Sequence, residues 1–185
     1  MKHKLTLTLA TLAAFFGWQW WEGQKRGQPA IAVDQTAIQA YFSPRGGASR
    51  AIVDALDGAE ESVFVQAYSF TSEPIAAALV RAKRRGVGVQ VLLDKSQKEN
   101  QKEYKQTKAP MLVRAGIPVW IDDKHSIAHN KVMIIDKKIV VTGSFNFTTS
   151  AEDRNAENLL IVKDPNLAAR YLANWESHRA HSVEY

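Results

Sequence analysis

The sequence contains no cysteine, and this absence limits what the protein can be. Disulfide bonds and thiolate metal sites are excluded, whereas the cellular compartment stays open because exported proteins can also lack cysteine. Other signatures are missing as well: the chain has no H-E-x-x-H motif, no dense acidic cluster and no Walker loop. We therefore expect the protein to need no metal and no cofactor.

The composition is ordinary for a globular protein. The 185 residues, 45% of them hydrophobic and 23% charged, fit one domain with a substantial core. The formal charge of +5 comes largely from the first 32 residues, because 20 basic and 18 acidic residues remain without them. Net charge alone therefore does not indicate a polyanionic partner.

Long hydrophobic runs are also scarce, and the one of note lies near the N-terminus. Two lysines precede the apolar residues 5–16, which is the form of a secretory signal. Three tryptophans and a basic pair follow in residues 18–26, as in an uncleaved anchor at a membrane interface. We expect residues 1–32 to be a signal peptide or membrane anchor with its linker, and residues 33–185 to form one catalytic domain. The protein is then exported, either periplasmic or secreted, with membrane anchoring as the alternative.

The rest of the chain alternates strand and helix patterns. Short apolar, β-branched runs predict strands at residues 38–42, 62–68, 87–93, 118–121, 128–135, 139–142 and 158–162. Apolar residues three and four apart predict helices at residues 48–59, 73–85 and 166–179. The polar segment 95–114 is predicted to be helical in its first half and broken near Pro110. Together these elements predict an α/β fold, a mixed β-sheet flanked by helices on both faces.

One short stretch carries side chains suited to chemistry. Residues two apart on a strand point to the same face, so His129 and Lys131 are predicted to project together. A hairpin that turns near Lys137 sets this pair opposite residues 145 and 143, which brings Ser144 and Asn146 beside it. A nucleophile or base, a fixed cation and two hydrogen-bonding groups suit a phosphate diester.

Two further residues of the stretch are predicted to support it. Gly143 allows the backbone to approach closely at the open end of the hairpin. Asp136 falls at the turn, at the far end from His129, where an aspartate commonly hydrogen-bonds backbone groups. We therefore predict a structural role for Asp136.

The same residues form a known signature. The pattern H-x-K-x4-D-x6-G-S-x-N is matched in full by His129, Lys131, Asp136, Gly143, Ser144 and Asn146, and in this the chain resembles the phospholipase D superfamily. The segments 66–71 and 127–131 are most similar to the small single-motif, periplasmic nuclease-like endonucleases of bacteria. The resemblance covers roughly residues 36–180 and implies a phospholipase D-like domain.

The resemblance also implies a mechanism. A covalent phosphohistidine intermediate is expected to form without a metal, with Lys131 and Asn146 binding phosphate. A downstream acidic residue orients the histidine in this superfamily, and Glu157 matches its position. Relatives with two motifs in one chain form a single site between them, which implies that a one-motif chain closes its site as a homodimer, with His129 of each copy facing the other.

Basic residues gather between positions 81 and 114. Lys98, Lys102 and Lys105 would share one helical face and could follow a nucleic-acid backbone. Acidic residues alternate with these lysines and would pair with them, as on an ordinary solvated helix. We weigh the two interpretations equally.

The other histidines are weaker candidates. His125 lies four residues before His129 and is an alternative proton donor for a monomeric site, although a loop histidine without a role is the simpler interpretation. His178 and His181 lie at the end of the last predicted helix and are expected to be solvated.

We therefore expect an exported, metal-independent endonuclease that cleaves DNA, with RNA as a further substrate and little sequence preference. A phospholipid hydrolase, of the phospholipase D or cardiolipin type, is the first alternative, because it shares the motif and the N-terminal tryptophans favour membrane association. A non-catalytic protein that binds nucleic acid or a membrane surface is the second alternative, against which the intact motif argues.

Overall fold

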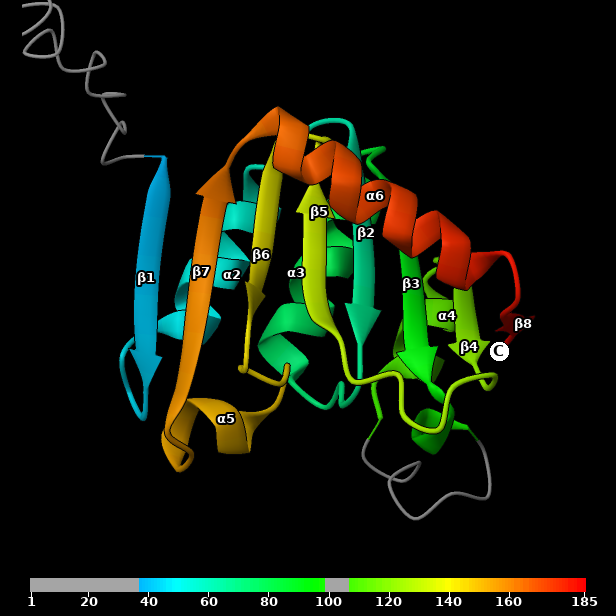
Figure 1. Ribbon diagram of the computed structural model, residues 1–185, viewed down its shortest axis with the longest axis horizontal. Coiled ribbons are helices and arrows are strands. Elements are labelled where there is room, and N and C mark those ends of the chain that lie inside the picture. The colour runs from blue at the N-terminus through cyan, green and yellow to red at the C-terminus, as the bar shows by residue number, and fades with distance from the viewer. Residues whose placement is uncertain (1–36, 99–106) are drawn as a thin grey trace, which may run out of the picture. The chain divides into compact units, whose positions relative to one another are not determined.

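The computed structural model describes residues 37–98 and 107–185 (Figure 1). These residues form an eight-stranded sheet in the order β1-β7-β6-β5-β2-β3-β4-β8. The strands are β1 (Ile38–Ser43), β2 (Ser62–Ala67), β3 (Gly88–Asp94), β4 (Val119–Asp122), β5 (Lys131–Ile135), β6 (Ile139–Gly143), β7 (Glu157–Lys163) and β8 (Val183–Glu184). The helices are α2 (Ala48–Asp57), α3 (Glu73–Arg84), the 3-10 helix η1 (Lys95–Gln97), α4 (Ala109–Arg114), α5 (Thr149–Asp153) and α6 (Pro165–Arg179).

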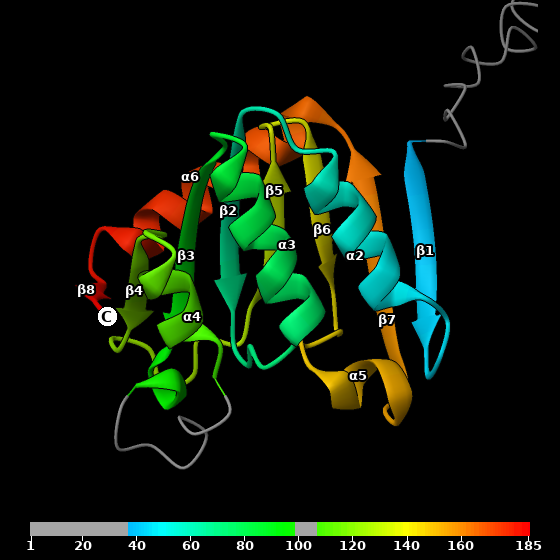
Figure 2. The same cartoon turned by 180° about the vertical axis from the view of Figure 1, so that it is seen from behind.

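The sheet is mixed, with helices on both faces, as predicted. β2, β3 and β4 run parallel, and the other neighbouring pairs are antiparallel. Figure 1 shows α6 crossing one face, and Figure 2 shows α2, α3 and α4 on the other. The predicted fold class is therefore confirmed.

Helix α3 illustrates how local sequence and packing agree. Pro74 stands in its first turn, where a missing backbone N–H costs nothing. Ile75 and Leu79, four residues apart, are fully buried against the sheet. The last turn is basic and opposes the negative end of the helix dipole. Gly86 then adopts a positive φ of 97°, which ends the element.

Two hydrophobic cores lie on opposite faces of the sheet. The larger core joins the sheet to α2, α3 and α4, whereas the smaller lies beneath α6 and centres on Trp175, which is 2% exposed. The indole Nε1 of Trp175 donates to the carbonyl of Val65 at 2.9 Å. Side chains along β5 alternate between the two faces of the sheet, so the strand contributes to both cores. Val132 and Ile134 face α6, while Met133 faces the other way.

The topology gathers several strand ends at one edge of the sheet. Because β5 and β7 run opposite to β2, β3, β4 and β6, they begin where the other four end. We call this the motif edge, defined by the residues at or directly after those ends: Tyr68, Asp94, Asp122, Lys131, Gly143 and Glu157. Ligand sites are commonly found where parallel strands end.

Three sequence predictions are corrected. Pro110 lies in the first turn of helix α4 rather than breaking a helix, because proline is favoured there. Strand β5 begins at Lys131, so His129 lies in the preceding loop and not on the strand. Lys98 is extended (φ −68°, ψ 151°) and follows a short 3-10 turn, so the described residues carry no helical lysine face there. Lys102 and Lys105 lie outside the described residues.

The hairpin register itself is confirmed. Val132 pairs with Thr142 and Ile135 with Ile139, which is the alignment predicted from a turn near Lys137. The predicted N-terminal segment, residues 1–32, lies outside the described residues. Over the ranges 37–98 and 107–185, no helix has the length and hydrophobicity needed to cross a membrane.

Candidate active site

One hollow at the motif edge brings together the residues that sequence analysis named as catalytic. It has a volume of about 330 Å³. Its lining consists of His129, Lys131, Gly143, Ser144, Asn146 and Glu157. These residues come from the hairpin β5–β6, from the loops directly before and after it, and from the start of the neighbouring strand β7.

Lys131 is a buried cation at the base of this hollow. Its residue is only 5% exposed, and its Nζ donates to the carbonyl of His129 at 2.6 Å. The ammonium also lies 5.2 Å from the centre of the Tyr68 ring. Burial lowers the pKa of Lys131, and the negative charges of Glu157 and Asp94 oppose that change.

Two residues outside the signature fix the loop that carries His129. The buried carboxylate of Asp94 accepts the backbone N–H of Ala128 at 2.7 Å. The backbone N–H of Tyr68 donates to the carbonyl of Asn130 at 2.9 Å, and its ring lies 4.7 Å from the imidazole of His129. Sequence analysis missed Asp94 and Tyr68, although their position just after buried strands was an available signal.

Gly143 lets two strands meet more closely than any other residue would allow. Its φ is 151°, and an added Cβ would lie 2.2 Å from the carbonyl oxygen of Asn158. Beside it, the Oγ of Ser144 accepts the backbone N–H of Asn158 at 3.1 Å, while the Ser144 N–H donates back to Asn158. This contact sets the spacing between β6 and β7 across the hollow.

The Asn146 side chain is open to a ligand. Its Oδ1 is buried, and nothing within the described residues hydrogen-bonds it. An amide can turn to offer either its oxygen or its NH₂ group. The backbone around it is fixed, because the Asn146 carbonyl accepts the Thr148 N–H at 2.7 Å and the Phe147 carbonyl accepts the Ser72 N–H at 2.9 Å.

Glu157 opens strand β7 and faces the same hollow. Its backbone N–H donates to Ser43 Oγ at 3.1 Å, and its Oε1 accepts from Asn155 Nδ2 at 3.1 Å. No hydrogen bond joins the two described residues Glu157 and His129. The negative charge of Glu157 instead favours the charged form of Lys131.

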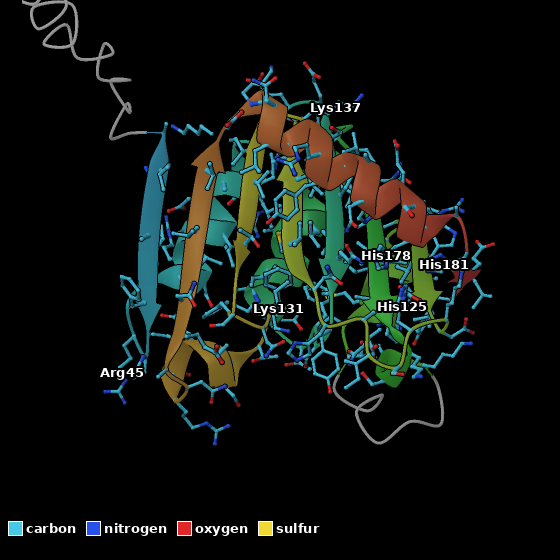
Figure 3. All side chains as sticks on the ribbon, in the orientation of Figure 1. Arg45, His125, Lys131, Lys137, His178 and His181 are labelled. Atoms are coloured by element: carbon cyan, nitrogen blue, oxygen red, sulfur yellow. The ribbon has the colours of Figure 1, made fainter. Side chains whose placement is uncertain are left out.

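Asp136 lies at the opposite end of the hairpin, beside Lys137, which Figure 3 shows far from Lys131. Its carboxylate accepts the backbone N–H groups of Glu60, Glu61 and Ser62 at 3.0, 2.7 and 2.9 Å. Burial raises the pKa of Asp136, but these hydrogen bonds outweigh it and the net change is downward. Asp136 thus ties the hairpin turn to the start of β2.

A second polar cluster occupies the motif edge, and the prediction that His178 and His181 are solvated is wrong. Figure 3 shows both of them close to His125, and all three histidines lie around the buried carboxylate of Asp122. The Nδ1 atoms of His125 and His178 lie 2.9 and 2.8 Å from Asp122 Oδ2. Burial raises the pKa of Asp122, but the hydrogen bonds from His178 and His125 outweigh it and bring the pKa to about 2. His125 faces this cluster and does not line the active-site hollow.

Lys98 belongs to a neighbouring hollow of about 400 Å³ that also includes Tyr68, Lys95 and Ile127. Its ammonium pairs with Asp123 at 3.0 Å. Lys95 Nζ donates to the carbonyl of His125 at 3.0 Å. Tyr68 therefore lies between the two hollows, and the second hollow is lined by two lysines and two aspartates.

The chain is similar in sequence to known proteins. Residues 52–179 match the family model described as "Cardiolipin synthase, PLD-like domain". A phospholipase D from Rickettsia bellii is 47% identical over 148 residues, which cover 80% of this chain and 72% of that protein. Mitochondrial cardiolipin hydrolase of Mus musculus is 32% identical over 125 residues, which cover 68% of this chain and 55% of that protein.

Solved structures are similar too. Nuc from Salmonella typhimurium, a phospholipase D family member, superposes with a TM-score of 0.73 at 37% identity, covering 80% of this chain and 97% of that one. NucT from Helicobacter pylori gives a TM-score of 0.71 at 26% identity, covering 80% and 99%. The fold and the site therefore define a phosphodiesterase. The chain belongs to the phospholipase D superfamily.

Proposed function

We propose that this phosphodiesterase is an endonuclease that cleaves DNA, and RNA as a second substrate, with little sequence preference. The observation that carries the proposal is the polar lining of both hollows at the motif edge, in which Ile127 is the one large aliphatic side chain of the described lining. A nucleic-acid backbone presents phosphate diesters in a row and needs no apolar pocket. The Tyr68 ring, between the hollows, is suited to stacking with a base.

His129 is proposed to act as the nucleophile. Its ring nitrogen attacks phosphorus, a phosphorus–nitrogen bond forms, and the bond to the leaving oxygen breaks as an acid gives that oxygen a proton. Water then attacks the phosphohistidine while the same group accepts a proton from it. The phosphorus–nitrogen bond breaks, which releases a phosphate monoester and restores His129.

The neighbouring side chains are proposed to stabilise the charge that develops on the phosphate. Lys131 and Asn146 face the equatorial oxygens, and Ser144 supplies a further hydrogen-bonding group. Lys131 brings the positive charge that a metal would otherwise bring, so divalent ions are not needed for turnover. Glu157 favours the charged form of Lys131 and is proposed to orient His129 once substrate is bound.

The acid is proposed to be His129 of a second copy. The mechanism needs two groups that exchange protons, and His129 is the one histidine among the residues that line the hollow. A two-fold homodimer would set the two copies of His129 against each other and share one site.

A phospholipid hydrolase is the second candidate function. The names of the rickettsial relative and of the mouse relative favour it. So does Ile127, which is 57% exposed next to the hollow and could contact lipid chains. Export through residues 1–32, with cleavage or with retention as a membrane anchor, is also proposed and fits either substrate.

One parallel assay separates these functions. Purified protein is incubated in EDTA with plasmid DNA, with RNA and with vesicles that contain labelled cardiolipin. The proposal expects nicked and then linear plasmid and fragmented RNA, with cardiolipin intact. Cardiolipin hydrolysis without nucleic-acid cleavage would establish the second candidate instead. His129→Asn is the control, and activity that survives this change would come from a contaminant.

A further inference from the structure

We propose that Asp122, His125, His178 and His181 form a structural site for Zn²⁺ or a similar transition-metal ion, apart from the active-site hollow. The four residues each offer one ligand atom, and these atoms all lie within 4.8 Å of one another. Three imidazoles and one carboxylate are a donor set that Zn²⁺ favours, whereas Ca²⁺ and Mg²⁺ prefer oxygen ligands alone.

Asp122 lies about as far from each of the three rings as tetrahedral coordination requires. Metal–ligand bonds of about 2.0–2.2 Å place neighbouring ligand atoms about 3.3 Å apart. Asp122 Oδ2 lies 2.9 Å from His125 Nδ1 and 2.8 Å from His178 Nδ1. Asp122 Oδ1 lies 3.4 Å from His181 Nε2. The four ligand atoms lie within 4.8 Å of one another, so side-chain rotations would have to bring the more distant ones closer to seat an ion.

The surroundings of the cluster also point to a ligand. The imidazole of His125 stacks on that of His178 with centroids 4.7 Å apart, and His181 lies 5.2 and 5.6 Å from the two rings. His181 Nε2 is buried, and no hydrogen bond of suitable geometry reaches it within the described residues, although Asp122 is near. One dication would accept a lone pair from each of the three neutral imidazoles and would offset the negative charge of Asp122. The Nδ1 protons of His125 and His178 would then move to their outer ring nitrogens or to solvent.

The position of the site suggests what a metal would do. Asp122 ends β4 and His125 follows in the loop that leads to His129, while His178 lies in the last turn of α6 and His181 between α6 and β8. Strand β8 has two residues, Val183 and Glu184, and pairs with the edge of β4. A bound ion would therefore fasten the C-terminal end of the chain to the loop before the active site. All four protein ligands would fill its coordination sphere, as in structural zinc sites.

The chain also shows a ligand spacing known from such sites. Asp122 and His125 are three residues apart, and so are His178 and His181. Two close pairs separated by a long intervening segment are the usual arrangement in structural zinc sites, because each pair is set by one local turn.

The test uses the full chain without a histidine tag, stripped with a chelator and dialysed. ZnCl₂ is titrated by calorimetry, and thermal melts are recorded with and without one equivalent. We expect one Zn²⁺ per chain and a melting temperature raised by about 5–10 °C. Co²⁺ should give the intense visible absorption of a tetrahedral site. Both effects should vanish in the double variant His178→Ala/His181→Ala and persist in His129→Asn, which keeps the cluster intact.

Two results would overturn the proposal. One is wild-type binding no tighter than that of the double variant, which would leave the cluster as a hydrogen-bonded acid–histidine network. The other is stoichiometric binding that His129→Asn abolishes, which would move the metal to the active site. If the double variant does not fold, His181→Gln keeps the test decisive, because we expect at least about tenfold weaker Zn²⁺ binding with an unchanged circular dichroism spectrum. Turnover in EDTA is measured separately, so this proposal and the proposed function can fail independently.

Discussion

The two polar clusters at the motif edge are assembled in opposite ways. The active-site hollow takes its residues from one hairpin and the strand beside it, within residues 129–157. The Asp122 cluster joins residues 122–125 to residues 178–181, from the far end of the chain. A site whose residues lie on one hairpin can be predicted from the spacing of those residues in the sequence. A site that joins distant parts of the chain can be recognised only once the fold is known.

The clusters also differ in what they leave open. In the hollow, the Asn146 amide oxygen is buried without a partner in the described structure, and its neighbours turn toward a space of about 330 Å³. Around Asp122 the polar groups turn toward one another. The first arrangement is suited to binding a substrate, and the second to holding the chain together. The following predictions test that contrast.

The largest effect is expected from the hollow. His129→Asn and Lys131→Met should each lower turnover by about 1,000-fold or more, because they remove the proposed nucleophile and the charge proposed to meet the phosphate. Methionine fills the space of the buried lysine better than alanine does, which limits damage to the fold. Initial rates on a phosphodiester, beside thermal melts, check this. The matched change in the other cluster, His178→Ala, should leave the rate at 25 °C within about twofold, and equal losses at both clusters would contradict the contrast.

Gly143→Ala should damage both stability and turnover. The added Cβ would meet the Asn158 carbonyl at 2.2 Å, so β6 and β7 must separate where the hollow lies. We expect a loss of about 2–3 kcal/mol in the free energy of unfolding, measured by urea titration. Gly116→Ala is the control for a positive φ, since its φ is 72° but no atom lies within 4 Å of the new Cβ. A control as damaging as Gly143→Ala would show that backbone strain, and not the close approach, is responsible.

Asp136→Ala should act on stability and spare turnover. Three backbone N–H groups lose a charged acceptor, which should cost about 2 kcal/mol at neutral pH. The pKa of Asp136 is lowered in the folded protein, so its contribution is complete above the ordinary value of 3.8 and is lost as pH falls through the depressed folded pKa. Melts of wild type and Asp136→Asn should therefore converge in acid. A variant that melts normally but has lost activity would refute the structural role.

The smallest effect on turnover is expected from His125→Ala. This residue faces Asp122 and not the hollow, so more than about half of the activity should remain at 25 °C. Sedimentation at assay concentration should show a dimer, since the second proton-transfer group is proposed to come from another copy. A fully active monomer that loses its activity without His125 would contradict the shared site.

The sequence predicted most of the sheet because its strands carry their own signals. Strand β2 and the hairpin β5–β6 are rich in β-branched residues and are buried. The short turn at residues 136–138 allows one pairing register between β5 and β6 that buries the apolar side chains on both faces. The signature residues were found for the same reason, since pairing across one hairpin follows from counting residues.

The elements that were missed depend on distant partners. Helix α5 has five residues, too few for a periodic pattern. Its Thr148 caps the Ala151 N–H, and its Glu152 accepts the N–H groups of Gly47 and Ser49 at the start of α2. The cluster of Asp122, His125, His178 and His181 joins residues that are more than 50 positions apart in the sequence. Only the crossing of α6 over the sheet, which ends beside β4, brings these residues together.

The central claim is that His129 carries the phosphoryl group between two displacements, and the stereochemistry at phosphorus tests it most directly. A dinucleotide with a chiral phosphorothioate diester is hydrolysed in ¹⁸O-labelled water that contains EDTA, and the configuration of the product is determined. Each in-line displacement inverts phosphorus, so two displacements should give net retention. Net inversion would show that water attacks the diester in one step, and would contradict the covalent role of His129.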